Sequence, residues 1–128
     1  MSIICTIFGA CLTLTGVPSV HDGDTITINH QNIRLFGIDA EELHEPHGDA
    51  ARLALVRIIN NQPVTCTHTG HNTHNRIVAK CRTSEGKDIG EMLVRAGQVL
   101  DCKKYSDGYY RRYEPLLIRS VLAQKPYC

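Results

Sequence analysis

The chain has 128 residues, and its 14 lysines and arginines nearly balance its 13 aspartates and glutamates, for a net charge of +1. A chain of this length fits one compact domain, so we expect a single domain over residues 1–128. The near-neutral charge excludes a general field that would hold polyanions, so nucleic-acid binding would need a local cluster of arginines and lysines. No apolar run approaches the roughly 20 residues of a spanning helix, so we expect no membrane span.

The first ten residues resemble the end of an export signal. Residues 1–10 combine a short apolar stretch with small side chains, but they lack the positively charged start that such a signal needs. We treat them as a candidate remnant of a signal, and the case for export depends on the cysteines instead.

Three strands are expected in the part of the chain that follows. Residues 11–20 alternate apolar and polar side chains loosely, and residues 25–29 and 33–38 alternate more clearly. Residues 30–32 supply turn-forming side chains between the last two strands, which predicts a hairpin. This hairpin would bring Asp24, just before its first strand, and Asp39, just after its second, to the same end.

The remaining pattern predicts helices around a second hairpin. Residues 48–60 form an amphipathic helix, and Asp88 caps a short helix that Gly97 ends. A last helix is expected over residues 107–123, where the proline at position 115 should kink it or mark its first turn. The whole pattern predicts an α+β fold, a five-stranded, OB-fold-like β-barrel with about three packed helices.

Six cysteines are many for so short a chain, and none belongs to a CxxC pair of the kind found in zinc or redox sites. Disulfides and an oxidising compartment are therefore expected, which favours a secreted or periplasmic protein. Cys102 bonded to Cys128 would tie the C-terminal tail down, but the sequence leaves the pairing of four cysteines open. These four are Cys5, Cys11, Cys102 and Cys128.

One disulfide follows from the second hairpin. Residues 63–68 and 76–82 are rich in β-formers and are joined by a turn-like stretch. If that connection is symmetric about residues 73–74, Cys66 lies directly opposite Cys81, within the Cα separation that a disulfide tolerates. The alternative is a facing pair of buried free thiols.

Acidic residues gather at the end of the first hairpin. Asp22 and Asp24 precede it, and Asp39, Glu41 and Glu42 follow it. Such a cluster needs a cation, and oxygen ligands favour a hard ion such as calcium, magnesium or manganese. The alternative is a set of solvated turn residues, because Asp-Gly is ordinary turn chemistry.

Two arginines stand near this acidic cluster. Arg34 shares a strand face with Phe36 and Ile38, where an apolar side chain would be expected, and Arg76 opens a later strand. Guanidinium groups match phosphate oxygens in pairs and stay charged, so two arginines beside a metal suit a phosphodiester substrate. The alternative is an ion pair between Arg34 and a neighbouring glutamate.

Four segments, in this order and spacing, resemble the staphylococcal nuclease or thermonuclease family. They cover much of residues 14–123 and read HDGDTITI, IRLFGIDAEE, NRIVAKC and GEMLVRAGQV. The fold of that family is a five-stranded barrel with helices. The resemblance implies a calcium-dependent endonuclease that hydrolyses both DNA and RNA and leaves 3′-phosphate ends.

The resemblance also implies roles for the acidic segment. Asp24 and Asp39 resemble the calcium-binding aspartates of the family, and the main-chain carbonyl of Ala40 resembles its backbone ligand. Glu42 resembles the general base that takes a proton from the attacking water. Calcium is thus the expected cofactor.

The substrate-binding residues follow from the same resemblance. Arg34 and Arg76 resemble the two phosphate-binding arginines, Tyr105 lies where an aromatic residue lines the nucleotide pocket, and His74 could meet a phosphate. We expect DNA and RNA as substrates of a monomeric enzyme.

Two departures from the family pattern affect this site. Glu41 stands where a proline is usual, so the turn that aims Glu42 should be less rigid and more negative. His74 and Asn75 replace the usual Tyr-Gly before Arg76, and asparagine tolerates the positive φ that the turn needs.

Two other interpretations remain open from the sequence. The same fold also occurs in the family as non-catalytic modules that bind nucleic acid or proteins, although those copies usually lose the carboxylates. His44, Glu45 and His47 have a spacing that could bind zinc, but they lie in a loop with Pro46 rather than on a helix.

Overall fold

The structure, a computed structural model, describes residues 2–5 and 11–128, so most of the candidate signal remnant lies outside the described residues. The strands are β1 (Ser2–Cys5), β2 (Cys11–Gly16), β3 (Ser19–Asp22), β4 (Thr25–Ile28), β5 (Gln31–Leu35), β6 (Ile38–Asp39), β7 (Val64–Thr73), β8 (Arg76–Arg82) and β9 (Leu100–Asp101). The helices are α1 (Gly48–Ile59), α2 (Ile89–Arg95) and α3 (Lys103–Ser106), with short 3-10 helices at Arg111–Tyr113 and Ile118–Ser120. Among the described residues, no helix has the length and apolar character needed to cross a membrane.

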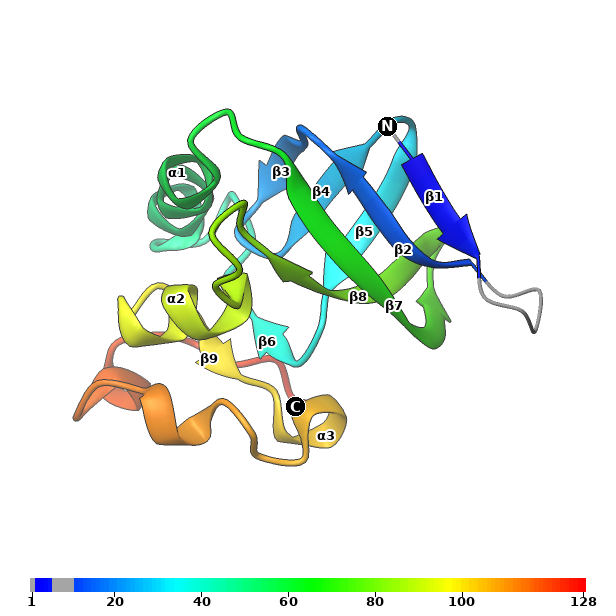
Figure 1. Ribbon diagram of the computed structural model, residues 1–128. Coiled ribbons are helices and arrows are strands. Elements are labelled where there is room, and N and C mark those ends of the chain that lie inside the picture. The colour runs from blue at the N-terminus through cyan, green and yellow to red at the C-terminus, as the bar shows by residue number, and fades with distance from the viewer. Residues whose placement is uncertain (1, 6–10) are drawn as a thin grey trace.

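The main sheet wraps into a barrel, with α1 and α2 beside one end and the C-terminal segment running past it (Figure 1). Its strand order is β1-β2-β7-β8-β5-β4-β3, in which β2 pairs with β7 and β3 pairs with β4. Only Val17 and Pro18 separate β2 from β3, so β2 and β3 together act as one bent strand. Its first half pairs with β7 and its second half with β4, which closes the barrel. Proline suits the bend because it donates no ladder hydrogen bond. Counted this way, the barrel has the five predicted strands, with β1 added outside β2.

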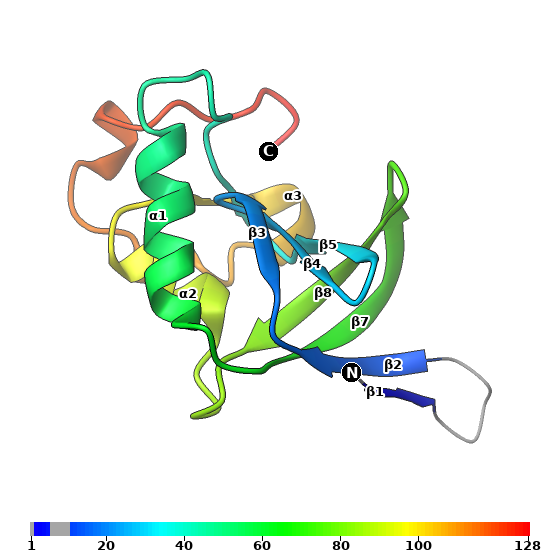
Figure 2. The same cartoon turned by 90° about the horizontal axis from the view of Figure 1, so that it is seen from above.

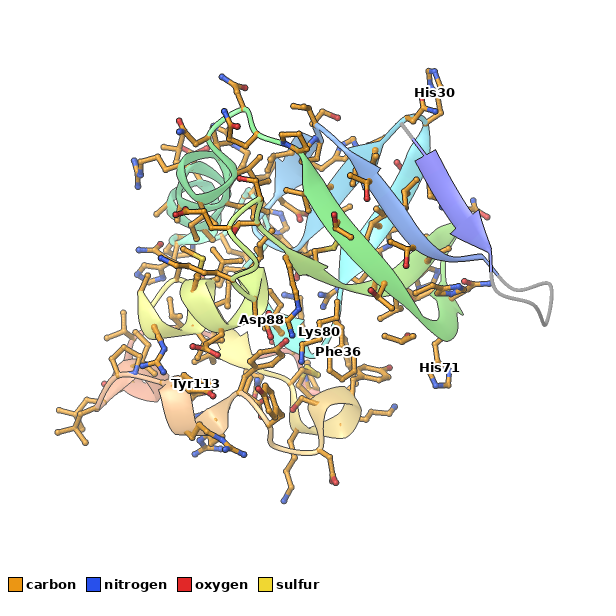
Figure 3. The ribbon with its side chains drawn as sticks, viewed as in Figure 1. His30, Phe36, His71, Lys80, Asp88 and Tyr113 are labelled. Atoms are coloured by element: carbon orange, nitrogen blue, oxygen red, sulfur yellow. A yellow bond between two sulfur atoms is a disulfide. The ribbon has the colours of Figure 1, made fainter. Side chains whose placement is uncertain are left out.

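The first hairpin forms as predicted, but its turn is shorter and earlier. The ladder between β4 and β5 continues to the pair Ile28 and Gln31, which leaves a two-residue turn at Asn29 and His30. Both turn residues have positive φ, 49° and 70°, the geometry whose twist matches the flanking strands. The predicted turn over residues 30–32 was therefore wrong by one to two residues, and His30 marks the true tip (Figure 3).

The second hairpin contains the predicted disulfide. Cys66 lies opposite Cys81 and the two are bonded. The stretch expected as a loop over residues 69–75 is mostly strand, however, because β7 continues to a tight turn at His74 and Asn75, where φ is 45° and 65°. A bulge between residues 68 and 72 shifts the register, so the cysteines face each other although the tip is not centred on residues 73–74.

The first two helices agree with the sequence analysis. Helix α1 buries Ala51, Ala54 and Leu55 on one face and ends at Asn60, which adopts the left-handed conformation. Helix α2 begins at Asp88, whose carboxylate accepts from the amides of Gly90 and Glu91 at 2.9 and 3.4 Å.

The predicted helix over residues 107–123 was wrong. Asp107 and Leu117 have positive φ values of 58° and 67°, and Pro115 donates no hydrogen bond, so a continuous helix cannot form. The segment instead forms two short 3-10 turns, and its charged side chains hold it. Glu114 accepts from Arg119 at 2.8 Å and from the amide of Asp101 at 2.9 Å.

The C-terminal segment is fastened to the barrel at several points. The Tyr110 hydroxyl, which is buried, donates to Asp88 at 2.9 Å, and Lys80 lies 3.5 Å from the same carboxylate, as Figure 3 shows for Lys80 and Asp88. Cys102 and Cys128 form a disulfide, which closes the tail back onto the start of α3. The final residues run beside the loop that precedes α1 (Figure 2).

Gly23 allows three segments of the core to meet. A Cβ at this position would lie 2.6 Å from the Cβ of Ala51 on α1 and 2.8 Å from the Cβ of Ala40. Both neighbours are buried and short, so neither can move aside as a flexible side chain would. The absence of a side chain at Gly23 therefore sets how closely the start of β4 approaches α1 and Ala40.

We predict that Gly23→Ala lowers the free energy of unfolding by about 1–3 kcal/mol, the usual cost of overpacking a core. Urea unfolding under non-reducing conditions measures this change. Ser84→Ala, at an exposed turn residue, is the control and should change stability little. An equal stability of Gly23→Ala and the control would contradict the proposed close packing.

Candidate active site

Asp24 joins three segments of the chain through its main chain and its carboxylate. Its main-chain carbonyl accepts from the amide of Leu35 at 2.8 Å, which fixes Asp24 beside β5. Its carboxylate accepts from the amide of Ala40 at 3.0 Å and lies 3.3 Å from the guanidinium of Arg34. Asp24 therefore lies at the same end of the hairpin as the Asp39–Ala40 segment, as the sequence predicts, and a direct hydrogen bond to the Ala40 amide joins them.

Burial affects the charge of Asp24. It raises the pKa of this carboxyl above the ordinary value, and the opposing effect of Arg34 does not offset it. The ionised form is therefore costly in this position. A further positive charge beside Asp24 would favour the ionised form again.

The two arginines converge on the same place from different strands. Arg34 on β5 also donates to the Leu35 carbonyl at 2.9 Å, while Arg76 at the start of β8 donates to Thr25 at 3.1 Å. The Thr25 hydroxyl in turn donates to Asp24 at 3.3 Å. Arg34 thus pairs with an aspartate rather than a glutamate, and Arg76 is linked to that aspartate through one hydroxyl.

A cavity of about 600 Å³ lies beside the arginines. Tyr105 and His74 help to line it, so the structure brings both predicted substrate-binding residues to the same space as Arg34 and Arg76. The ring of Tyr105 packs edge-on against Tyr127 with centroids 6.4 Å apart. Tyr127 lines the cavity too, and the other lining residues are Leu35, Phe36, Gly37, Ile38, Thr69, His71, Asn72, Thr73, Val78 and Lys104.

Figure 3 shows Phe36 beneath the barrel and His71 at the lower end of β7, pointing away from the sheet. Both residues belong to the cavity wall. The wall therefore combines aromatic rings with basic groups, a composition suited to bases and phosphates together.

Asp39 and Ala40 face a different cation. Asp39, at the end of β6, is 2% exposed, and its two oxygens accept from the amide of Lys125 at 2.8 Å and the ammonium of Lys125 at 3.4 Å. The same ammonium donates to the Ala40 carbonyl at 3.1 Å. It also lies 3.6 Å from Glu42 and 3.7 Å from Glu45.

These acidic neighbours determine the charge of Lys125. Burial alone would lower the pKa of the ammonium, but the carboxylates of Asp39, Glu42 and Glu45 raise it above the ordinary value. Lys125 is therefore a permanent positive charge at neutral pH, surrounded by oxygen atoms.

Glu42 lies in a tight loop between β6 and α1. Its amide donates to the side chain of Glu45 at 2.6 Å, and its own side chain is 48% exposed. A Cβ at Gly48 would overlap the main-chain carbonyl of Glu42, so only glycine lets α1 begin this close to the loop. The carboxylate of Glu42 consequently stays at the protein surface beside Asp39 and Ala40.

A sequence profile described as staphylococcal nuclease homologue matches residues 32–125. The chain belongs to this family. The matched range includes both arginines, the Asp39–Glu42 segment and Lys125, whereas Asp24 precedes it. The fold and the recognition of the family from the sequence are therefore confirmed.

Known relatives extend this comparison. The chain is 30% identical over 113 residues to the succinoglycan biosynthesis protein ExoI of Rhizobium meliloti, covering 80% of this chain and 59% of ExoI. It is 28% and 27% identical to uncharacterized endonucleases of Escherichia coli and of its O157:H7 strain, covering 75% of this chain and 66% of each relative. The chain thus spans less than two-thirds of the length of these relatives.

One departure of this homologue from the family pattern has an unexpected outcome. Glu41 was expected to loosen the turn before Glu42, but it is 4% exposed and points inward. Its carboxylate accepts from the amide and ring of His47, each at 3.0 Å, and from the amide of Ala123 at 2.9 Å. The expectation of a loose turn was wrong, because Glu41 clamps the loop to the C-terminal tail.

The oxygen atoms near Ala40 are of the kind that a hard cation prefers, although among the described residues they are not arranged as a complete metal site. Asp24, Asp39 and the Ala40 carbonyl supply oxygen atoms, and the ammonium of Lys125 already stands against two of these groups. In the part of the chain that the structure describes, however, no three His, Cys, Asp or Glu side chains are grouped to hold a metal. The zinc alternative gains no support, since the ring of His47 is bonded to Glu41.

Three residues of the site escaped the sequence analysis. The cross-strand pair of Thr25 with Arg34 could have indicated Thr25, because directly opposed residues touch. Lys125 and Tyr127 gave no such signal, since the contact between Lys125 and Ala40 spans 85 residues. Only the folded chain brings the tail to the site.

We predict that Glu41→Gln lowers the free energy of unfolding at neutral pH by about 1–3 kcal/mol. The substitution removes a buried negative charge that accepts hydrogen bonds from His47 and Ala123. Burial alone would raise the pKa of Glu41, but the hydrogen bonds from Ala123 and His47 bring it below its ordinary value of 4.5. The stabilisation is therefore complete above about pH 4.5 and is lost as the pH falls through the lowered pKa.

The measurement is urea unfolding of both proteins between neutral pH and about pH 3. The difference between the wild type and Glu41→Gln should shrink on acidification. Glu85→Gln, at an exposed turn position, is the matched control. A difference that stays constant down to the lowest pH would contradict the assigned role of Glu41.

Proposed function

We propose that this protein is a metal-dependent endonuclease that hydrolyses phosphodiester bonds in DNA and RNA. The observation that carries the proposal is the convergence of Arg34 and Arg76 on Asp24 and Thr25 at one cavity. Two fixed guanidinium groups beside buried acids suit a substrate that is itself an anion. The names of the Escherichia coli relatives, which are uncharacterized endonucleases, agree with this class of reaction.

The arginines bind the phosphate and stabilise the transition state. Arg34 is held by Asp24 and the Leu35 carbonyl, so its guanidinium is oriented before substrate arrives. Arg76 is oriented by Thr25. Preorganised cations stabilise the charge that grows on the phosphoryl oxygens, and they read no base sequence, which suits both DNA and RNA.

Asp24, Asp39 and the carbonyl of Ala40 are the proposed calcium ligands. When bound, calcium would add its two positive charges to those of the two arginines near the phosphoryl oxygens. The hydrogen bond between Asp24 and the Ala40 amide keeps these ligands in one place. All three are oxygen donors, which favours calcium over a softer metal.

Glu42 is the proposed general base. Its carboxylate is half exposed and lies on the loop that follows Asp39 and Ala40, so water has access to it. It would take a proton from the attacking water, which displaces the 5′ oxygen and leaves a 3′-phosphate. Glu41 supports this position by holding the loop to His47 and Ala123.

The cavity wall would bind the nucleotide. Tyr105 is 54% exposed and offers a ring face for stacking, and His74 lies at the tip of the β7–β8 turn next to Arg76. The disulfides Cys66–Cys81 and Cys102–Cys128 support an oxidising compartment, so we propose a secreted or periplasmic protein. The enzyme would act as a monomer.

The purified chain is predicted to degrade single-stranded DNA with calcium and to stop when calcium is chelated. Glu42→Gln should lower kcat by about 100-fold to 10,000-fold, since it removes the base. Arg34→Lys and Arg76→Lys should each lower kcat by about 100-fold to 1,000-fold. Lysine keeps the positive charge but lacks the two parallel N–H donors of the guanidinium group. Release of acid-soluble nucleotides measures the rate, and labelled ends report the 3′-phosphate.

Matched controls separate catalysis from general charge effects. Glu85→Gln and Arg57→Lys change exposed residues outside the site and should keep full activity. Full activity of Glu42→Gln would refute the proposed base. Binding of DNA without cleavage in the presence of calcium would assign the chain to the non-catalytic modules of the family instead.

Tyr105→Ala is predicted to raise KM with little change in kcat. Loss of one stacked base typically costs about 1–3 kcal/mol of binding free energy. Tyr105→Phe keeps the ring and should retain the KM of the wild type. If both variants behave alike, the ring does not stack on the substrate.

A further inference from the structure

The ammonium of Lys125 lies where a bound cation would be expected. It stands 3.1 Å from the carbonyl of Ala40 and 3.4 Å from Asp39, two of the three groups proposed to hold calcium. It is also 3.6 Å from Glu42 and 3.7 Å from Glu45. Four oxygen atoms within 3.7 Å surround one positive charge, so Lys125 is held by a group of acceptors rather than by a single ion pair.

The charge around Lys125 is not balanced. Three carboxylates face a single ammonium, so negative charge remains in excess at this place. A divalent cation would neutralise more of it and would accept several carboxylate and carbonyl oxygens at shorter range. The surroundings of Lys125 therefore suit a doubly charged ion better than the ammonium that stands there.

The side chain of Lys125 can leave without unfolding the tail. The side chain as a whole is 23% exposed, so part of it already meets solvent. The amide of Lys125 donates to Oδ2 of Asp39 at 2.8 Å, while the ammonium uses Oδ1. A swing of the side chain would free Oδ1 and the Ala40 carbonyl and would keep the amide contact.

Two anchors keep Lys125 close to the site. The amide of Ala123, two residues before Lys125, donates a hydrogen bond to Glu41 at 2.9 Å. Cys128, three residues after Lys125, forms a disulfide with Cys102. Figure 2 shows this tail running beside the loop before α1. Because the ammonium is tethered on both sides, its effective concentration at Asp39 is high.

We propose that Lys125 is a built-in competitor for the divalent cation, and that metal binds at Asp39 and Ala40 only when this side chain swings out. The inference rests on the proposed function, since it uses the calcium ligands named there. The apparent calcium affinity is then reduced in proportion to the fraction of molecules in which the site is open. The C-terminal tail thereby sets the metal concentration at which the site fills.

Calcium titration calorimetry of the metal-free protein tests the competition. Lys125→Met keeps most of the stem and removes the charge, so it should bind calcium roughly tenfold or more tightly than the wild type. Lys87→Met, at an exposed lysine on the turn before α2, is the matched control and should bind like the wild type. Calcium should also raise the Tm of Lys125→Met more than that of the wild type.

The outcomes distinguish this inference from the proposed function. Equal affinities of wild type and Lys125→Met, or weaker binding by the variant, would overturn the competition and leave the calcium site standing. Absence of binding by both proteins would overturn the calcium site as well. Tighter binding by Lys125→Met alone supports the competition.

A measurement on the wild type covers the case in which Lys125→Met does not fold. Acetylation of lysines by a soluble reagent, mapped by mass spectrometry, reports the accessibility of each ammonium. Saturating calcium should raise the labelling rate of Lys125 several-fold, with Lys87 as the internal reference. An unchanged rate for Lys125 in a protein that binds calcium would contradict the swing.

Discussion

The buried carboxylate of Asp24 is the contact on which the rest of the site depends. It accepts from the Ala40 amide, pairs with Arg34 and receives the hydroxyl of Thr25. A buried charge is tolerated only when such partners are in place, so these contacts favour one arrangement of the strand ends. The close packing at Gly23 adds a steric constraint to the same arrangement. Fold and site geometry thus depend on the same few atoms.

The C-terminal tail satisfies two further buried acids, Asp39 and Glu41. Asp39 and Glu41 are 2% and 4% exposed, and both accept from tail amides, at Lys125 and Ala123. Displacing the tail would take Lys125 away from Asp39 and the Ala123 amide away from Glu41, and Glu41 would keep its contacts with His47. Losing partners is costly for buried carboxylates. The disulfide between Cys102 and Cys128 therefore reinforces a tail that the acidic segment already requires.

The sequence predicted what depends on local pattern. Strand alternation, the opposed pair Cys66 and Cys81, and the α1 pattern are all encoded within short stretches, and the family motifs place the arginines. The helix over residues 107–123 failed because positive φ values and Pro115 break it, and charged side chains hold it by tertiary contacts. Lys125 was missed because its partners lie about 85 residues away in the chain. Such contacts follow from the whole fold and leave no periodic signal.

Ala40 connects the two halves of the site. Its amide donates to Asp24, which pairs with Arg34, and its carbonyl accepts from Lys125. On the proposed function, a phosphate that draws on the guanidinium of Arg34 would weaken its ion pair with Asp24, which would leave this buried carboxylate short of positive charge. A cation close to Asp24 would then become more favourable. The proposed phosphate and cation sites would then share one charge balance, in which the arginines, the acids and Lys125 cannot be assigned independent energies.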